Sequence, residues 1–445
     1  MGNFLGSPVT EKETHVGETH EYRYGLSTMQ GWRTHMEDAH IAETSVYYVA
    51  DDSSKVVLQN HGIFAVFDGH GGTYAAKYSG RNFCRVLSKQ PKWQDYAKLF
   101  EASKSETTEK EKVESNRRVL LECLEQALKD AFVELDQEIG LASEGRPVTA
   151  ADTPYHDAAA AAPKSADNNT NDNDDATNEF SDEKYVMMQA AAEHVNTLNQ
   201  NENQYKASTA EDPTDDSGTT ACVVLVTPDH LVCANAGDSR AVYSKNGNKA
   251  IPLSYDHKPD DEGEERRIRA AGGYVAGGRV EGDLAVSRGL GDFRFKNMPT
   301  VLAGFNSNST PVDVSPQSAR TVLPKDQKVS PVPDIIVQNR NPEQDEYIIV
   351  ACDGIWDVRT NQEGVLEIAE VLKEGESDVG VMAEEVLDRC LELRSKDNMT
   401  AIIVLFPLQK IGEGGGVAAR REERAKQQQF EAEQAQGQNL QLSTL

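Results

Sequence analysis

Two short segments of the chain place an aspartate and a glycine directly after an apolar run. "AVFDG" ends in Asp68 and Gly69, and "VACDG" ends in Asp353 and Gly354. Apolar runs of this length are typical of buried strands. A buried strand that ends in a carboxylate holds that group at a defined edge of a sheet. A capping aspartate at a turn is the alternative for one such segment, but the matched pair favours a functional site.

Two further acidic positions precede strand-like segments. Glu37 and Asp38 in "RTHMEDAH" precede residues 41–50, and Asp397 in "KDNMTAIIV" precedes residues 399–406. If these strands share a sandwich, their ends can converge on one edge, where the carboxylates would repel one another. Mg²⁺ or Mn²⁺ with oxygen ligands relieves such repulsion. The pattern therefore predicts a metal site built from carboxylates.

His70 and Arg33 are the candidate groups that would act beside the metals. An imidazole titrates near pH ~6.5, so His70 could protonate a leaving group near neutrality. Arg33, four residues before Glu37, could bind a tetrahedral oxyanion through two hydrogen bonds. Taken alone, a structural histidine and a surface salt bridge are the simpler interpretations. Together the groups indicate hydrolysis of a phosphate ester by water activated between two metals about 4 Å apart.

The elements that must position these residues can be read from periodicity. Apolar residues recur at spacings of three and four over residues 116–140, which predicts a helix that ends at Gly140. Further helices are predicted at 73–89, 260–271, 363–372 and 380–393, and further strands within 219–245 and at 345–352. Because strands and helices come in blocks, the sequence favours an α+β class with helices on largely antiparallel sheets.

One folded domain is predicted over residues 22–407, after an N-terminal segment at 1–21. An insert at about 141–216 interrupts it, and its 16 acidic residues against 4 Lys and Arg predict disorder. A calcium loop at 172–183 is disfavoured because the sixth position is not glycine. Residues 301–333 are expected to form a long loop, and 408–445 a Gln-rich tail that is disordered or weakly helical.

Composition limits the class of protein. The net charge of −28 argues against nucleic-acid binding. Six cysteines without a CxxC pair favour reduced thiols in an intracellular protein over disulfides or zinc. The segment "MGNFLGSPVTEKE" lacks the basic start and long apolar stretch of a secretion signal, and no apolar run approaches the ~18 residues of a membrane span. It begins Met-Gly, so Gly2 is a candidate for N-myristoylation, although Gly6 stands where the pattern has Ser or Thr.

The chain resembles the metal-dependent protein phosphatases, the type 2C serine/threonine phosphatases. The resemblance covers about 22–407 and follows the family's order: "RTHMEDAH", "FAVFDGHGG", "SGTTA", "ANAGDSRAV", "DHKP", "GGRVEGDLAVSRGLGDFRFK", "ACDGIWD" and "SKDNMTAIIV". It implies a four-layer α-β-β-α sandwich of two antiparallel sheets with a binuclear metal site at one edge.

Motif positions imply the role of each site residue. Asp68 would bridge two metals, Asp353 and Asp397 would hold the first, and Glu37 with the Gly69 carbonyl would serve the second. Arg33 would clamp the phosphate and His70 would be the general acid. Asp238 in "AGDSRA" matches a position for a third, weaker metal. Supporting or substrate positions are Asp38, Thr220, Arg279, Asp357 and Asn398, and Asp292 in "GLGD" is assigned a structural role.

The resemblance implies hydrolysis of phosphoserine and phosphothreonine in proteins, dependent on Mg²⁺ or Mn²⁺, with a role in signalling. Phosphoproteins would be the partners of a monomer in the cytoplasm or nucleus. Some relatives with a start like "MGNFL" are N-myristoylated, which would attach the chain to membranes through Gly2. One alternative is a scaffold that binds basic proteins, such as histones, through the acidic insert. Hydrolysis of a small phosphorylated metabolite is a further alternative that the resemblance disfavours.

Overall fold

The structure is a computed structural model that describes residues 4–51, 53–103, 110–143, 216–296 and 322–426. The calcium alternative at 172–183, most of the predicted insert and long loop, Gly2 and the end of the tail lie outside these residues.

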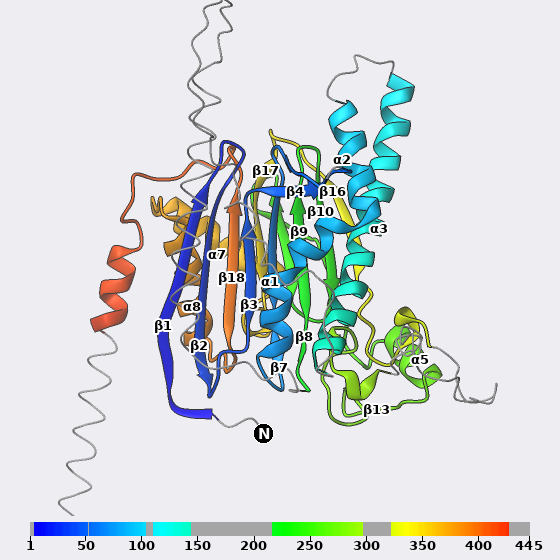
Figure 1. Cartoon of the computed structure of the whole chain (residues 1–445). Helices are drawn as coiled ribbons and strands as arrows, with labels where there is room; N and C mark the ends of the chain where they lie inside the picture. The colour runs from blue at the N-terminus through cyan, green and yellow to red at the C-terminus, as the bar shows by residue number, and fades with distance from the viewer. Residues whose placement is uncertain (1–3, 52, 104–109, 144–215, 297–321, 427–445) are drawn as a thin grey trace, which may run out of the picture.

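Two antiparallel sheets form the body of the protein (Figure 1). The first has the order β1 (Phe4–Glu18), β2 (Arg23–Arg33), β18 (Met399–Leu405), β17 (Asp345–Ala351), β11 (Arg240–Lys245) and β12 (Lys249–Pro252). The second has the order β16 (Asp334–Asn339), β10 (His230–Ala236), β9 (Ala221–Val226), β6 (Gly62–Phe67) and β3 (Ala39–Glu43). Every pairing in both sheets is antiparallel.

The central strands β6, β9, β10 and β18 are buried at every position because both of their faces are covered. In β17, Tyr347 and Ile349 belong to an apolar cluster with helices, whereas Ile348 and Val350 belong to a cluster shared by the two sheets. This is the two-residue alternation of a strand. The core therefore comprises one cluster between the sheets and one on the outer side of each sheet.

Helices cover the outer face of each sheet. The second sheet packs against α1 (Tyr74–Lys89), α2 (Pro91–Ser103) and α3 (Lys110–Ser143), and the first against α7 (Asn361–Lys373) and α8 (Val379–Glu392). The predicted α+β class is confirmed. Among the described residues, none of the helices combines the length and apolar character needed to cross a bilayer.

Smaller elements surround the body. The helix α5 (Glu262–Ala270) and the hairpin β13 (Val275–Ala276) with β14 (Arg279–Val280) contribute to a separate small apolar cluster. A three-stranded ribbon joins β15 (Leu290–Gly291), β8 (Gly218–Thr219) and β7 (Gly69–His70). The remaining elements are the hairpin β4 (Val46–Val49) with β5 (Lys55–Leu58), the short helix α6 (Asp353–Trp356), and the 3-10 turns η2 (Phe293–Phe295) and η4 (Pro324–Asp326).

Three predicted boundaries differ from the structure. The strand β1 lies within the N-terminal segment at 1–21, and its polar sequence reflects its position at the edge of the sheet. The helix α3 continues past Gly140 to Ser143, so Gly140 is not its C-cap. The folded part extends past its predicted end at 407, because residues 418–426 form a helix whose arginines pair with acids on α8.

Candidate metal centre

Antiparallel pairing gathers the predicted residues at one edge. Strands β2, β6, β10 and β17 end at this edge, and β3, β9, β11 and β18 begin there. The edges of the two sheets are in contact here, since the Thr400 hydroxyl of β18 donates to Asp38 Oδ2, next to β3, at 2.6 Å. The predicted site residues within two positions of these strand ends are Arg33, Glu37, Asp38, Asp68, Gly69, Thr220, Asp238, Asp353, Asp397 and Asn398.

Three carboxyls at this edge are crowded and carry perturbed pKa values. Burial and the neighbouring Asp353 and Asp38 raise the pKa of Asp68 well above its ordinary value. Burial and Asp238 likewise raise the pKa of Asp353. Burial raises the pKa of Asp38 to about 7, despite the hydrogen bond from Thr400. Such shifts mark carboxylates that lack compensating positive charge.

The donor atoms of this cluster fit a divalent cation. Among the described residues, Asp38 Oδ1 and Asp353 Oδ1 are buried without a hydrogen-bond partner. Buried polar atoms are rarely left unpaired, and an ion is one explanation. Asp38, Asp68 and Cys352 also offer ligand atoms within 4.8 Å of one another. Carboxylate oxygens are the ligands that Mg²⁺ and Mn²⁺ prefer.

Cys352 is the member of this cluster that sequence reasoning missed. Its signal was its place directly before Asp353 in "ACDG". Burial raises the pKa of its thiol well above the ordinary value. The sulfur accepts from the Thr400 N–H at 3.2 Å and donates to the Asn398 carbonyl at 3.5 Å. Cys352 therefore connects β17 to β18 beneath the cluster.

The glycines of the two Asp-Gly pairs allow neighbouring segments to pack closely. A Cβ at Gly69 would overlap the Glu37 carbonyl oxygen, and a Cβ at Gly354 would overlap the Asn398 carbonyl oxygen. The sequence assigned Gly69 to close approach of a metal through its carbonyl. The structure adds a separate reason, because this glycine brings the Glu37 segment against the strand that carries Asp68.

Arg33 and Asn398 organise the segment around Glu37. The Arg33 guanidinium pairs with the Asp397 carboxylate, while its Nε is buried without a partner among the described residues. The Asn398 side chain accepts from the Glu37 N–H at 3.0 Å and donates to the carbonyls of Gln30 and His35 at 2.8 and 2.9 Å. Asn398 thus holds the Glu37 segment at the edge.

His70 has a partner that the sequence assigned only a structural role. The His70 Nε2 lies 3.0 and 2.9 Å from the two carboxylate oxygens of Asp292. Burial alone would lower the pKa of His70, but the Asp292 carboxylate outweighs it, so the pKa is raised. The pair favours a protonated imidazole.

Asp238 is paired with a lysine. The Lys258 Nζ lies 2.5 Å from Asp238 Oδ2. Asp357 is close to both groups: burial raises its pKa, Lys258 lowers it and Asp238 raises it. Thr220 supports the same region, because its hydroxyl lies 2.7 Å from the hydroxyl of Ser239 and accepts from the Asp68 N–H at 3.3 Å.

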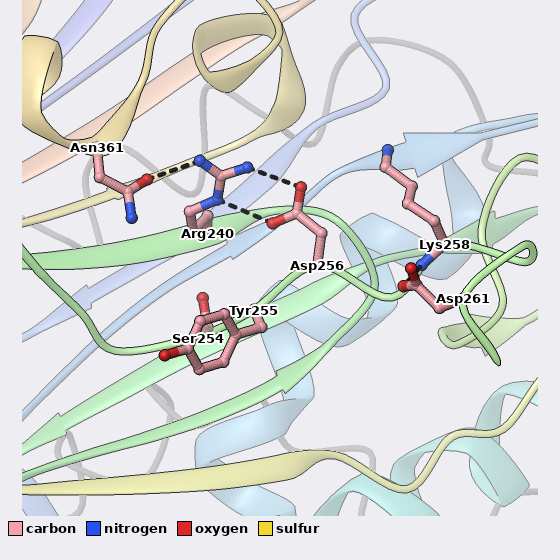
Figure 2. Close-up of a pocket in the computed structure, with 7 residues that line it drawn as sticks. All are labelled: Arg240, Ser254, Tyr255, Asp256, Lys258, Asp261 and Asn361. Atoms are coloured by element: carbon pink, nitrogen blue, oxygen red, sulfur yellow. Dashed lines mark hydrogen bonds and ion pairs between the residues drawn. The ribbon is translucent and has the colours of Figure 1, made fainter. Parts of the chain in front are cut away.

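A cleft of about 450 Å³ adjoins this lysine (Figure 2). Figure 2 shows Arg240 at its wall, with the guanidinium bound by Asp256 at 2.8 Å and by Asn361 at 2.7 Å. The cleft is lined by Arg240, Ser254, Tyr255, Asp256, Lys258, Asp261 and Asn361.

Arg279 is the predicted site residue that the structure does not bring to the cluster. It is exposed in the hairpin of β13 and β14, and its guanidinium donates to the Asp283 carbonyl at 2.5 Å.

Comparisons with known proteins show the family of this chain. A model of the family "Protein phosphatase 2C" matches residues 22–154 and 152–399. "Probable protein phosphatase 2C T23F11.1" of Caenorhabditis elegans is 34% identical over 91% of this chain and 80% of its own length. "Protein phosphatase ppm-1.A" of the same organism is 31% identical over 92% of this chain, which spans 64% of that relative's length.

Solved structures show the same fold. A serine-threonine phosphatase 2C from Toxoplasma gondii superimposes with a TM-score of 0.54 at 18% identity, covering 91% of this chain and 100% of that one. A second phosphatase from that organism gives a TM-score of 0.53 at 20% identity, over 90% and 97% of the two chains. By its family-model match and its relatives, the chain belongs to the protein phosphatase 2C family.

Proposed function

We propose that this protein hydrolyses phosphoserine and phosphothreonine in protein substrates with the help of divalent cations. The observation that carries the proposal is the crowding of Asp68, Asp353 and Asp38 at one edge, where two buried carboxylate oxygens lack partners among the described residues. Membership of the phosphatase family and the names of the relatives support the substrate class.

Two Mg²⁺ or Mn²⁺ ions are proposed to be held at this edge of a four-layer α-β-β-α sandwich, and the three apolar clusters support the layering. Asp68 would serve both ions, Asp353 and Asp397 the first, and Glu37 with the Gly69 carbonyl the second. When bound, the ions would supply an activated water and neutralise the charge of the carboxylates. Asp238 would serve a third, weaker ion.

The protein's own residues would bind the substrate and move its proton. Arg33 is 41% exposed, so its guanidinium can exchange Asp397 for a phosphate and orient it by two hydrogen bonds. His70 Nε2 faces Asp292, which leaves Nδ1 to carry the proton given to the serine or threonine oxygen. Acid assistance of this kind contributes about 10²- to 10⁴-fold in rate.

The test is hydrolysis of a phosphoserine peptide with Mn²⁺, with a chelator, and by Asp68→Asn. We expect the chelator to abolish activity and Asp68→Asn to lower kcat/KM by more than about 100-fold, since even the outer partners of a metal contribute 10- to 100-fold. Asp95→Asn is the matched control, because Asp95 forms an exposed pair with Lys92. Activity that survives both chelator and Asp68→Asn would refute the proposal.

Other sequence predictions remain predictions. They are N-myristoylation of Gly2 with membrane attachment, basic protein partners of the acidic insert, a monomeric state, and an intracellular location in cytoplasm or nucleus. The intact mass of the native N-terminal peptide would decide the first of these.

A further inference from the structure

The turn that carries Asp292 has an unfavourable backbone conformation. Gly291 has φ of 78° and Asp292 has φ of 53°, in the left-handed region that residues other than glycine rarely adopt. Such a conformation is unfavourable for aspartate and persists only where surrounding contacts impose it. The contacts that impose it here lie outside the metal centre.

Asp136 of α3 and Lys296 supply these contacts. The Asp136 Oδ1 accepts from the Gly291 N–H at 2.8 Å and from the Lys296 Nζ at 2.6 Å. The Lys296 Nζ also donates to the Gly289 carbonyl at 2.9 Å. The side chains of Lys296 and Asp136 are only 0% and 7% exposed. A buried ion pair with additional hydrogen bonds is rigid, because any displacement leaves a buried charge uncompensated.

The Asp292–His70 pair packs closely against the backbone of Ser217 and Gly218. The Asp292 N–H donates to the Ser217 carbonyl at 3.1 Å. A Cβ on Gly218 would overlap both the Asp292 carboxylate and His70 Nε2. The imidazole is therefore oriented by Asp292, and Asp292 is oriented by the turn.

We propose that Asp136 and Lys296 are positioning residues for the proton donor. They would fix the turn at 289–292, so that Asp292 holds the His70 imidazole toward the leaving oxygen. The inference rests on the proposed function, in which His70 is the general acid. Neither Asp136 nor Lys296 would touch the substrate.

The reaction offers a readout specific to this role. As the bond from phosphorus to the serine oxygen breaks, the His70 proton passes to that oxygen and yields the serine hydroxyl. The oxygen of one water forms the new bond to phosphorus, and one proton of that water stays on the phosphate product. The other proton of the water is released, and His70 takes up one proton in its place, so the enzyme returns to its starting state. A serine alkoxide is a strong base and needs this proton, whereas p-nitrophenolate is a far weaker base and leaves without it.

The experiment compares kcat on a phosphoserine peptide and on p-nitrophenyl phosphate at saturating Mn²⁺. For Lys296→Met and Asp136→Asn we expect kcat on the peptide to fall about tenfold or more, as part of the 10²- to 10⁴-fold of acid catalysis. On p-nitrophenyl phosphate we expect less than about a twofold change. Arg118→Met is the matched control, because it removes an exposed charge from α3 and should alter neither rate.

Asp136→Asn keeps the shape of the side chain and an acceptor for the Gly291 N–H, so it carries the test if Lys296→Met does not fold. Equal losses on both substrates, or no loss on either in a variant with a native circular dichroism spectrum, would overturn the inference. His70→Ala separates the two hypotheses. If it shows no difference between substrates, the assignment of His70 as general acid fails and the inference fails with it. If His70→Ala lowers kcat more on the peptide than on p-nitrophenyl phosphate, but Lys296→Met and Asp136→Asn do not, only the inference fails.

Discussion

Lys258 occupies the position beside Asp238 where a third cation was expected from the sequence. Its ammonium is 2.5 Å from Asp238 Oδ2. Burial alone would lower the pKa of Lys258, but Asp238 raises it, so the side chain stays charged. A lysine and a divalent ion would compete for the same carboxylate, which explains physically why a third ion would bind weakly.

Removing this charge should strengthen binding of the weakest cation. For Lys258→Met we expect the affinity for the weakest-bound Mn²⁺, the one proposed at Asp238, to rise about tenfold or more. The reason is that a positive charge within a few ångströms of this ion is lost. Counting bound Mn²⁺ by equilibrium dialysis checks the prediction without an activity assay. Lys98→Met, which breaks the exposed pair with Asp51, is the control. Unchanged or weaker binding in Lys258→Met would show that the lysine does not compete.

At the scale of elements, Glu264 connects α5 to the segment before the Asp292 turn. Its carboxylate accepts from the Ser287 hydroxyl at 2.6 Å and pairs with Arg267 at 2.7 Å and Arg288 at 2.8 Å. Arg288 continues to Asp334 of β16 at 2.7 Å. Burial raises the pKa of Glu264, but the two arginines outweigh it and lower the pKa to about 2.

This pKa predicts a pH dependence of stability. Because the pKa falls from 4.5 to about 2 on folding, the stabilisation is complete above pH ~4.5 and is lost as the pH falls toward ~2. At 1.36 kcal/mol per pKa unit it is on the order of 3 kcal/mol. Urea unfolding of wild type and Glu264→Gln at several pH values measures this contribution to the free energy of unfolding. The contributions of the other carboxyls are the same in both proteins and cancel when the two free energies are subtracted.

We expect the advantage of wild type over Glu264→Gln to shrink steadily below pH ~4.5. Glu265→Gln is the matched control on the same helix, because Glu265 forms an exposed pair with Arg269 and such pairs contribute little. A difference between wild type and Glu264→Gln that stays constant with pH would contradict the assignment.

At the scale of the whole molecule, both ends of the described chain meet on α8. Lys12 of β1 pairs with Asp388 at 2.6 Å. Near the other end, Arg421 and Arg424 pair with Glu385 at 2.7 and 3.0 Å, although the Glu385 side chain is 0% exposed. Burial raises the pKa of Glu385, but the arginines outweigh it and lower the pKa. Residues 417–426 are therefore part of the folded domain.

A truncation after residue 416 should destabilise the protein. Glu385 would lose both arginine partners, and removing one partner of a buried pair costs about 3–5 kcal/mol. Water that enters in place of the helix lowers this cost, so we expect about 1–3 kcal/mol in urea unfolding. Truncation after residue 426 should change nothing, and Glu385→Gln should partly restore the shorter chain. Equal stability of the two truncated proteins would show that the helix at 418–426 does not contribute.

The sequence alone predicted the strands that carry the candidate metal centre. Asp68 and Asp353 could be identified because an apolar run with an acid at its end is a local pattern. Less of the periphery was predictable. The strand β1 has the polar residues of an exposed edge, and the helix at 418–426 has a sequence that is stabilised only by its contacts with α8. Gly140 lies within the last turn of α3 because the packing of this helix outweighs the local preference of glycine.

The sequence by itself determined the α+β class, because strands and helices come in blocks. It also determined several of the acids that gather at one edge, because each adjoins an apolar run. Which residues touch was decided only by the tertiary structure. His70 meets Asp292, 222 positions away, Asp238 meets Lys258, and Asp38 bonds to Thr400. Such pairs depend on strand register and on glycines that let backbones approach, and no local pattern specifies which distant side chain will arrive.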